Sequence, residues 1–380
     1  MNSIWEGNCY LGWLHFGMGL LVMDLKSAVD GVVGRLVDRG GVVGVGLFGD
    51  LSKYEWSGSV VDVLVVGGPR VSFEFEEILE YGGLLFDVNH VPYRVVGDVV
   101  SPDLDHRLFE LEVLFDGEGV LSRAKVFVGD KYRSRGRVEV RTDGYLTGAD
   151  MYMSRAASAL TRGDVGSAVV YGEAAVTPVA HLLMDVAGFP VTRGALVWNL
   201  RRACERLRLM DVFGDFLGVM RLGGVDVEQA SVLLGVFEDV WGYLRGVILG
   251  ESGLQVGMPV RMRRDIEYLT SPLLLRLIRG RVGVLLDGFD SVGAVFYLRS
   301  WLLPLLEAYA WVVSSARGDK FDYTGLFRVV RGDPVVYEGA GRVFGLGNVD
   351  ARGLLVGVRD LIGRVRGVRN SLIDGYVGML

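Results

Sequence analysis

The chain has 380 residues and a formal net charge of −6. At roughly 150 residues per domain, this length predicts two or three domains. The acidic balance argues against a chain dedicated to nucleic acid, so any such contact must be local. The two cysteines, Cys9 and Cys204, lie far apart and give neither a disulfide framework nor a metal-ligand spacing. We therefore expect a reducing, cytoplasmic compartment.

The composition is also poor in Asn, Gln, Cys and His, and Arg far outnumbers Lys. A shortage of thermolabile residues is typical of a thermophile. Codon bias is the alternative explanation.

Residues 9–23 form an apolar run near the beginning of the chain. The run is short for a membrane span and contains His15. Glu6 precedes it and no basic residue does, which is a poor pattern for a signal peptide. We expect a strand or helix packed on the core, or an extension that precedes a natural start at Met18 or Met23, and no membrane span.

The next stretch predicts a helix followed by two strands. Apolar residues at helical spacing predict the helix over residues 24–39, and Val-rich runs predict strands at 42–48 and 60–66, joined by a polar turn. Asp62 lies inside the second strand. An ionised carboxylate in an apolar layer is costly unless it is paired or binds a metal. Asp62 is therefore either a strand-end residue that accepts hydrogen bonds from loop amides or a functional group.

The residues LFGDLSKYEWSGSVVDVLVV, at 47–66, resemble the signature strand–turn–strand of the polymerase-β-type nucleotidyltransferases, in particular the small antibiotic-modifying and archaeal branch. In that family a Gly-Ser pair is followed in the next strand by Asp, one apolar residue and Asp. Side chains two apart on a strand point the same way, so the two Asp form half of a site for two Mg²⁺ ions that clamp the triphosphate. The Gly-Ser turn brings N–H groups and a hydroxyl to the phosphates.

Two positions depart from this pattern. Gly49 stands at the Gly and Asp62 at the second Asp, but Asp50 replaces the Ser and Val60 replaces the first Asp. Val60 cannot bind a metal, and the charge of Asp50 repels an NTP unless a cation lies between them. The family's third carboxylate lies on a following strand, where residues 84–96 supply Asp87.

The resemblance implies a set of site residues. They are Asp62 and Asp87 as catalytic residues, Asp50, Asp62 and Asp87 as ligands of a rebuilt Mg²⁺ site, and Gly49, Asp50 and Ser59 as the turn that contacts the nucleotide.

Three further features of this part have local interpretations. Acidic residues predict a helix with a solvated face over residues 73–81, and His90 is either a satisfied polar residue or a catalytic group. A strand is expected at 108–115, and the segment 116–121 resembles the turn that closes this domain. The basic run KYRSRGRVEVR at 131–141 is either an exposed linker, which we favour, or a contact to the phosphates of a substrate or RNA.

Beyond residue 151 the pattern becomes helical. Helices are expected at 153–160, 167–187 and 195–209, with Asp164 able to cap the second. This layout resembles the helical domain that follows such nucleotidyltransferase domains, and Glu173 is either a surface charge, which we favour, or a general base. Long apolar helices are expected at 233–249, 266–278, 294–316 and 354–373, buried against one another or against a second copy of the chain. Arg clusters along them either bind anions or pair with nearby Asp and Glu.

The sequence thus predicts an α+β fold. A nucleotidyltransferase-like mixed sheet with flanking helices occupies residues 1–140, and an all-α helical-bundle region follows, with a helical domain at 141–223 and a C-terminal helical domain at 224–380. Two functions fit. The first is a weak or non-catalytic scaffold that binds a nucleotide, with a protein partner or a homodimer formed through the helical region and nucleic acid contacted only through local Arg clusters. The second is an active Mg²⁺-dependent enzyme that moves NMP from an NTP to a hydroxyl of a small molecule, RNA or protein.

Overall fold

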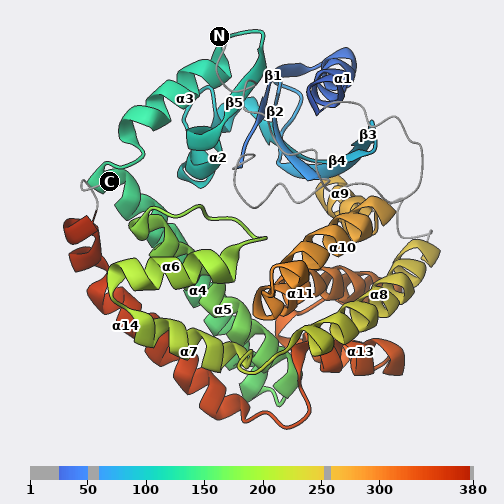
Figure 1. The fold of residues 1–380 in the computed structure, drawn as a ribbon. Helices are drawn as coiled ribbons and strands as arrows, with labels where there is room; N and C mark the ends of the chain where they lie inside the picture. The colour runs from blue at the N-terminus through green and yellow to red at the C-terminus, as the bar shows by residue number, and fades with distance from the viewer. Residues whose placement is uncertain (1–24, 50–59, 252–257, 377–380) are drawn as a thin grey trace.

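The computed structural model describes residues 25–49, 60–251 and 258–376. Its strands form one five-stranded sheet in the order β3-β4-β2-β1-β5. The strands are β1 (Val42–Leu47), β2 (Val60–Gly67), β3 (Phe75–Tyr81), β4 (Leu84–Pro92) and β5 (Glu112–Asp116). β2 and β4 run parallel, whereas the other neighbouring pairs run antiparallel. A mixed sheet followed by a helical region confirms the predicted α+β fold (Figure 1).

The two faces of the sheet have different coverings. α1 (Leu25–Asp38) packs on one face, where it meets alternate residues of β2 such as Val61 and Val63. α2 (Asp105–Glu110) and α3 (Val120–Lys131) pack on the other face against Leu64 and Val66. Short 3₁₀ turns at Tyr93–Val95 and Pro102–Leu104 connect β4 to α2. The strand predicted at 108–115 begins only at Glu112, because α2 extends through Glu110.

The helix predicted over residues 73–81 is wrong, because this segment is strand β3, paired antiparallel with β4. Gly82 and Gly83 join the two strands, and both have positive φ, at 59° and 82°. A two-residue turn of this kind favours a tight hairpin, and glycine adopts it without strain. Three of the glutamates that suggested a solvated helical face, Glu76, Glu77 and Glu80, lie on the strand instead.

The helical region surrounds α5 (Val165–Ala187), which packs against α4, α6 and α14. Its helices are α4 (Arg135–Thr161), α6 (Leu196–Leu207), α7 (Met210–Met220), α8 (Val227–Gly250), α9 (Val260–Leu269), α10 (Pro272–Asp287), α11 (Ser291–Ala316), α12 (Leu326–Val330), α13 (Pro334–Phe344) and α14 (Ala351–Tyr376), with a 3₁₀ turn at Tyr323–Gly325. The carboxylate of Asp164 accepts a hydrogen bond from the Ser167 N–H at 3.1 Å, which confirms the predicted cap. Within the described ranges α5 is the one helix long and apolar enough to cross a bilayer, but 78% of its most apolar window is buried inside the fold.

The basic run at 131–141 is not the exposed linker that the sequence suggested. It forms the end of α3 and the start of α4, and Arg141 is buried. The predicted boundary at residue 140 falls inside α4. Ile78 and Leu85 of the sheet belong to the same apolar core as the helices, so that core extends across this point.

Candidate functional site between the sheet and the helices

Two carboxylates lie side by side on the sheet. Asp62 on β2 and Asp87 on β4 are paired directly in the parallel ladder. Side chains alternate along a strand, and Val61 and Val63 pack toward α1, so Asp62 points to the opposite face, toward the helical region. The structure therefore brings together the two residues predicted to be catalytic.

Asp62 is paired with a cation from the C-terminal half of the chain. Nη2 of Arg281, on α10, lies 3.2 Å from Oδ2 of Asp62. The same helix is fastened to the sheet by Arg276, which donates two hydrogen bonds to Glu80 at 2.9 and 3.0 Å. Asp62 is thus a paired carboxylate and does not lie at a strand end among loop amides.

Asp87 has a hydroxyl partner. The Tyr268 hydroxyl, on α9, lies 3.1 Å from one Asp87 carboxylate oxygen and 3.3 Å from the other. Burial raises the pKa of Asp87 to about 7, the negative charges of Asp62 and Glu76 act in the same direction, and Tyr268 and Arg193 offset part of the rise. Near neutral pH this carboxyl is therefore close to the midpoint of its titration.

Gly49 follows β1 and lines the same site. Its φ of 90° is a backbone conformation that side chains rarely adopt. Asp50 and Ser59, predicted to contact the nucleotide, lie outside the described residues. Val60, at the position of the family's first Asp, is partly buried and packs against the core of the helical region.

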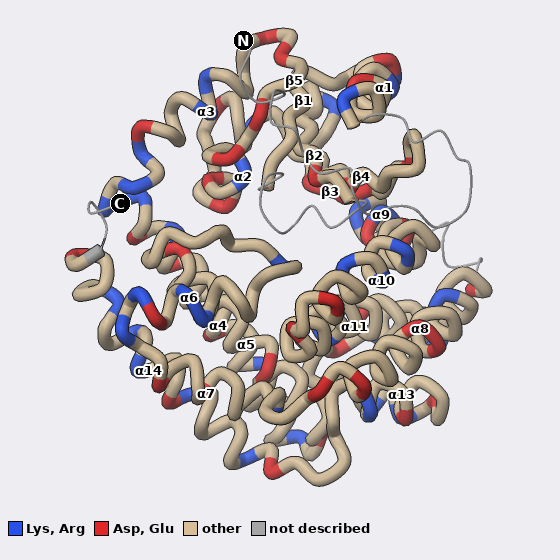
Figure 2. Tube along the Cα trace, viewed as in Figure 1, with Lys and Arg blue, Asp and Glu red and all other residues tan. Residues whose placement is uncertain are grey.

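A cavity of about 760 Å³ lies between the sheet and the helices. Its sheet side includes Asp62, Glu76 and Asp87, and its helical side includes Arg193 and Trp301. Figure 2 shows acidic positions on the strands near basic positions on α9 and α10. Cavities of roughly 300–1,000 Å³ bind small molecules and cofactors, so this volume is sufficient for a nucleotide.

Of the three predicted Mg²⁺ ligands, Asp62 and Asp87 lie in the described residues, and Asp50 lies outside them. Nowhere in residues 25–49, 60–251 and 258–376 are three His, Cys, Asp or Glu side chains grouped to hold a metal ion. Asp62 has Arg281 as its partner, and Asp87 accepts a hydrogen bond from Tyr268. Cation binding at this pair therefore requires these contacts to change.

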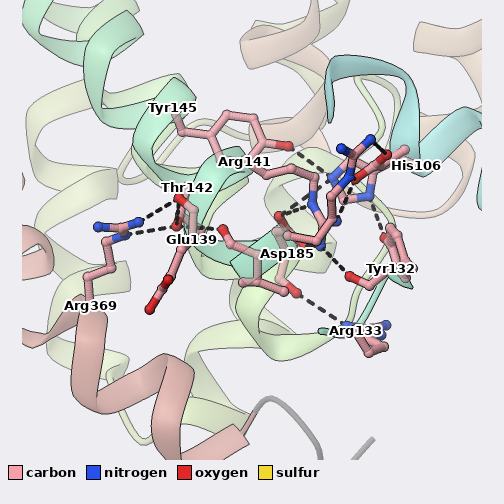
Figure 3. A network of polar contacts seen from close by, with 12 residues as sticks. His106, Tyr132, Arg133, Glu139, Arg141, Thr142, Tyr145, Asp185 and Arg369 are labelled. Carbon is pink, nitrogen blue, oxygen red and sulfur yellow. Dashed lines mark hydrogen bonds and ion pairs between the residues drawn. The ribbon is translucent and has the colours of Figure 1, made fainter. Parts of the chain in front are cut away.

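A buried ion cluster joins the sheet part of the chain to the helical part (Figure 3). The guanidinium of Arg141, on α4, lies 2.8 Å from carboxylate oxygens of both Asp105 and Asp185. Asp105 also accepts two hydrogen bonds from Arg137 at 2.6 and 2.8 Å. Since both carboxylates are almost fully buried, their charges depend on these arginines.

His106 extends this cluster toward the cavity. Its two ring nitrogens lie 2.5 Å from the Tyr132 hydroxyl and 2.9 Å from the Tyr145 hydroxyl. Burial lowers the pKa of His106 to about 4. The imidazole is therefore neutral at neutral pH, with one nitrogen donating and the other accepting.

Glu173 is not a surface charge, so the favoured interpretation of this residue is wrong. It is buried between Arg299, at 3.3 Å, and Arg221, and burial raises its pKa while the two arginines offset part of the rise. Arg299 also donates to the backbone oxygens of Met220 and Val343 at 2.6 and 2.9 Å. Arg299, paired with Glu173, therefore joins the ends of α7 and α13.

His90 has partners of its own. Its Nε2 lies 2.8 Å from Glu77, and its ring stacks on Phe75 at 4.3 Å. His90 does not line the cavity. The interpretation as a satisfied polar residue is confirmed.

Three site residues were missed from the sequence: Tyr268, Arg281 and Arg193. The Arg cluster that includes Arg281 was noted, but its partner was sought among neighbouring acids, whereas Asp62 is 219 positions away. The only signal for such a pair was Asp62 itself, because a carboxylate in an apolar strand needs a cation. Nothing in the sequence indicated which cation.

Together these features define an α+β protein with a charged cavity between a mixed sheet and a helical bundle. No protein-family model matches the sequence, and no curated protein matches it either. Among solved structures, the chain is similar to a nucleotidyltransferase-like protein from Exiguobacterium sibiricum, with 12% sequence identity and a TM-score of 0.30. The match covers 51% of this chain and 66% of the other, so the chain spans just under two thirds of that protein's length.

Proposed function

We propose that this chain is a nucleotidyltransferase-like scaffold that binds a nucleotide in the cavity and transfers NMP weakly or not at all. The observation that carries the proposal is the ion pair between Arg281 and Asp62. It puts a protein cation beside the carboxylate that the resemblance assigns to Mg²⁺.

The electrostatics of the carboxylate pair support this proposal. A divalent cation at Asp62 meets the positive charge of Arg281 and has to compete with it for the carboxylate. The pKa of Asp87, raised to about 7 by burial first and by Asp62 second, leaves this carboxyl partly protonated at neutral pH and therefore a poor metal ligand. Val60 supplies no ligand.

The test is calorimetric titration of the purified chain with each NTP, with and without Mg²⁺ or Mn²⁺. We expect binding with an affinity that changes little when the metal is removed, and no release of pyrophosphate. Binding that requires the metal, followed by NMP transfer to an acceptor, would contradict the proposal.

The second candidate is an active Mg²⁺-dependent nucleotidyltransferase. The observation that favours it is the pairing of Asp62 with Asp87 in one register beside Gly49, all three lining the cavity. In that case Asp62→Ala abolishes transfer and leaves the circular dichroism spectrum unchanged. Transfer that survives this substitution would show that the assigned site is wrong.

The partner proposals concern the helical region. A protein partner or a second copy of the chain would bind there, and nucleic acid only through local Arg clusters. Light scattering of the purified chain distinguishes a homodimer from a monomer that needs another protein.

A further inference from the structure

Arg193 is an exposed residue that lines the cavity and stacks on an aromatic ring, and within the described residues it makes no hydrogen bond or ion pair. Arg193 lies in the segment between α5 and α6, which reaches toward the middle of the molecule (Figure 1). Its guanidinium carbon is 4.0 Å from the centre of the Trp301 ring on α11. Stacking fixes the plane of a guanidinium and leaves its N–H groups free to donate at the edge.

Arg193 differs in this respect from the other arginines of the cavity. Each of the others donates to a side chain: Arg107 to Asn89, Arg141 to Asp105 and Asp185, Arg281 to Asp62, and Arg299 to Glu173. Within the described part of the chain, no hydrogen bond or ion pair of Arg193 is found. Its positive charge is therefore available to a ligand that enters the cavity.

The preceding residue offers a second polar group. Thr192 also lines the cavity, and its Oγ1 is buried with no hydrogen-bond partner among the described residues. A buried hydroxyl without a partner is unfavourable, and rotation of this side chain toward the cavity would let an oxygen atom of a ligand satisfy it. A charged donor and a hydroxyl donor thus occur at consecutive positions.

The charge of Arg193 acts on Asp87 and His181, but among the described residues it forms an ion pair with neither. The pKa of His181, which lines the same cavity, is lowered to about 4 by burial first, then by His106 and by Arg193. The carboxylates Asp62 and Asp87 have their own partners in Arg281 and Tyr268. An anion at Arg193 therefore does not compete with an existing ion pair.

We infer that Arg193, Thr192 and Trp301 form an oxyanion subsite on the helical side of the cavity. It binds a phosphate or carboxylate group of the ligand through the guanidinium edge of Arg193 and the Thr192 hydroxyl, with Trp301 as the platform that orients the guanidinium. This inference adds a specific binding subsite to the proposed function. It rests on the proposed function in one respect, namely that the cavity is a ligand site. The type of anion is decided by the experiment.

The test uses the full chain labelled with 5-fluorotryptophan, with the Trp301 ¹⁹F resonance assigned by comparison with Trp301→Phe. Pyrophosphate and citrate are titrated separately in EDTA, without nucleotide. We expect a saturable shift of the Trp301 resonance, with the tighter of the two ligands showing whether phosphate or carboxylate is preferred. In Arg193→Ala the affinity should fall at least about tenfold, the loss expected for one charge-assisted hydrogen bond.

Two further variants control this result. Arg202→Ala removes an arginine that stacks on Phe189 at 4.8 Å but does not line the cavity, and it should leave the affinity unchanged. Arg193→Lys keeps the charge without the planar edge and should bind with intermediate affinity. A wild-type Trp301 resonance that neither ligand shifts, or an equal loss in Arg193→Ala and Arg202→Ala, would overturn the inference.

The same readout separates this subsite from the nucleotide proposal. Pyrophosphate binding that depends on Arg193, together with no binding of any NTP, would leave the subsite standing and reject the nucleotide. NTP binding that is unaffected by Arg193→Ala, with no response to either free oxyanion, would support the nucleotide proposal and reject the subsite.

Discussion

Arg281 and Asp62 form an ion pair at 3.2 Å across 219 positions of sequence. The pair attaches α10 to β2 at the carboxylate that the family pattern assigns to a metal. A cation from solution has to compete with Arg281 for the Asp62 carboxylate.

Removing the guanidinium should open Asp62 to divalent cations. We expect Arg281→Ala to bind Mn²⁺ about tenfold more tightly than the wild type, because losing a like charge near a protein surface is worth on the order of 1 kcal/mol or more. Calorimetry or Mn²⁺ electron paramagnetic resonance measures the affinity. Arg276→Ala, which removes the pair with Glu80 on the same helix, is the control and should bind Mn²⁺ as the wild type does. Equal affinities in Arg281→Ala and the wild type would show that Arg281 does not block the site.

The pKa of Asp87 should appear in the pH dependence of stability. Because its pKa is raised from 3.8 to about 7 on folding, the folded state binds more protons than the unfolded state between these values, and this group lowers the free energy of unfolding as pH rises through that window. Asp87→Asn removes this contribution, so the free energy of unfolding should fall less between about pH 4 and about pH 7.

Urea denaturation at several pH values measures this slope. Asp116→Asn is the control, because the pKa of Asp116 is lowered, with backbone hydrogen bonds from Ser122 and Leu121 outweighing burial. The stability that Asp116 contributes is present above its ordinary pKa and is lost only as pH falls below it. The slope above about pH 5 should therefore stay the same in that variant. A slope unchanged in Asp87→Asn would argue against a raised pKa.

The buried cluster around Arg141 should be important for stability. Arg141→Met leaves Asp105 and Asp185 without a shared cation, and losing one partner of a buried pair costs about 3–5 kcal/mol. Urea unfolding at neutral pH measures the loss. Arg201→Met removes only an exposed pair with Glu205 and should change the free energy of unfolding by about 0.5 kcal/mol or less. Similar losses in the two variants would mean that the cluster does not contribute as its burial implies.

Two helical glycines should respond oppositely to alanine. A Cβ at Gly172 on α5 would lie 2.7 Å from Leu355 of α14, so Gly172→Ala should destabilise the fold by about 1–3 kcal/mol through overpacking. A Cβ at Gly235 on α8 would meet no atom within 4 Å, and Gly235→Ala should stabilise by about 0.5–1 kcal/mol through the better helix propensity of alanine. Thermal unfolding of both variants checks the prediction, and a stabilising Gly172→Ala would mean that α5 and α14 pack less closely than observed.

Sequence patterns correctly predicted those structural features that are determined by residues close together in the sequence. The two Val-rich strands, the cap at Asp164 and the other long apolar helices follow from spacing and composition within short windows. The single helix predicted at 266–278 is wrong, because α9 ends at Leu269 and α10 begins at Pro272. The strand at Phe75–Tyr81 was missed because the spacing of its glutamates is also typical of a helix with a solvent-exposed face. The Gly82-Gly83 pair that follows it is typical of a hairpin turn. The pairings of Asp62 with Arg281 and of Asp87 with Tyr268 depend on how distant segments fold together, and no periodicity encodes such a choice.

Because α4 is one continuous helix, it limits how the sequences of the two halves of the chain can change independently in evolution. The helix begins beside the sheet and continues into the bundle, and its Arg141 binds Asp105 on one side and Asp185 on the other. The two halves are therefore not interchangeable modules. A recombination that exchanged the bundle would remove the helical partners of Asp62, Asp87 and Asp105 at once. Substitutions at these three carboxylates therefore require matching changes in the helices.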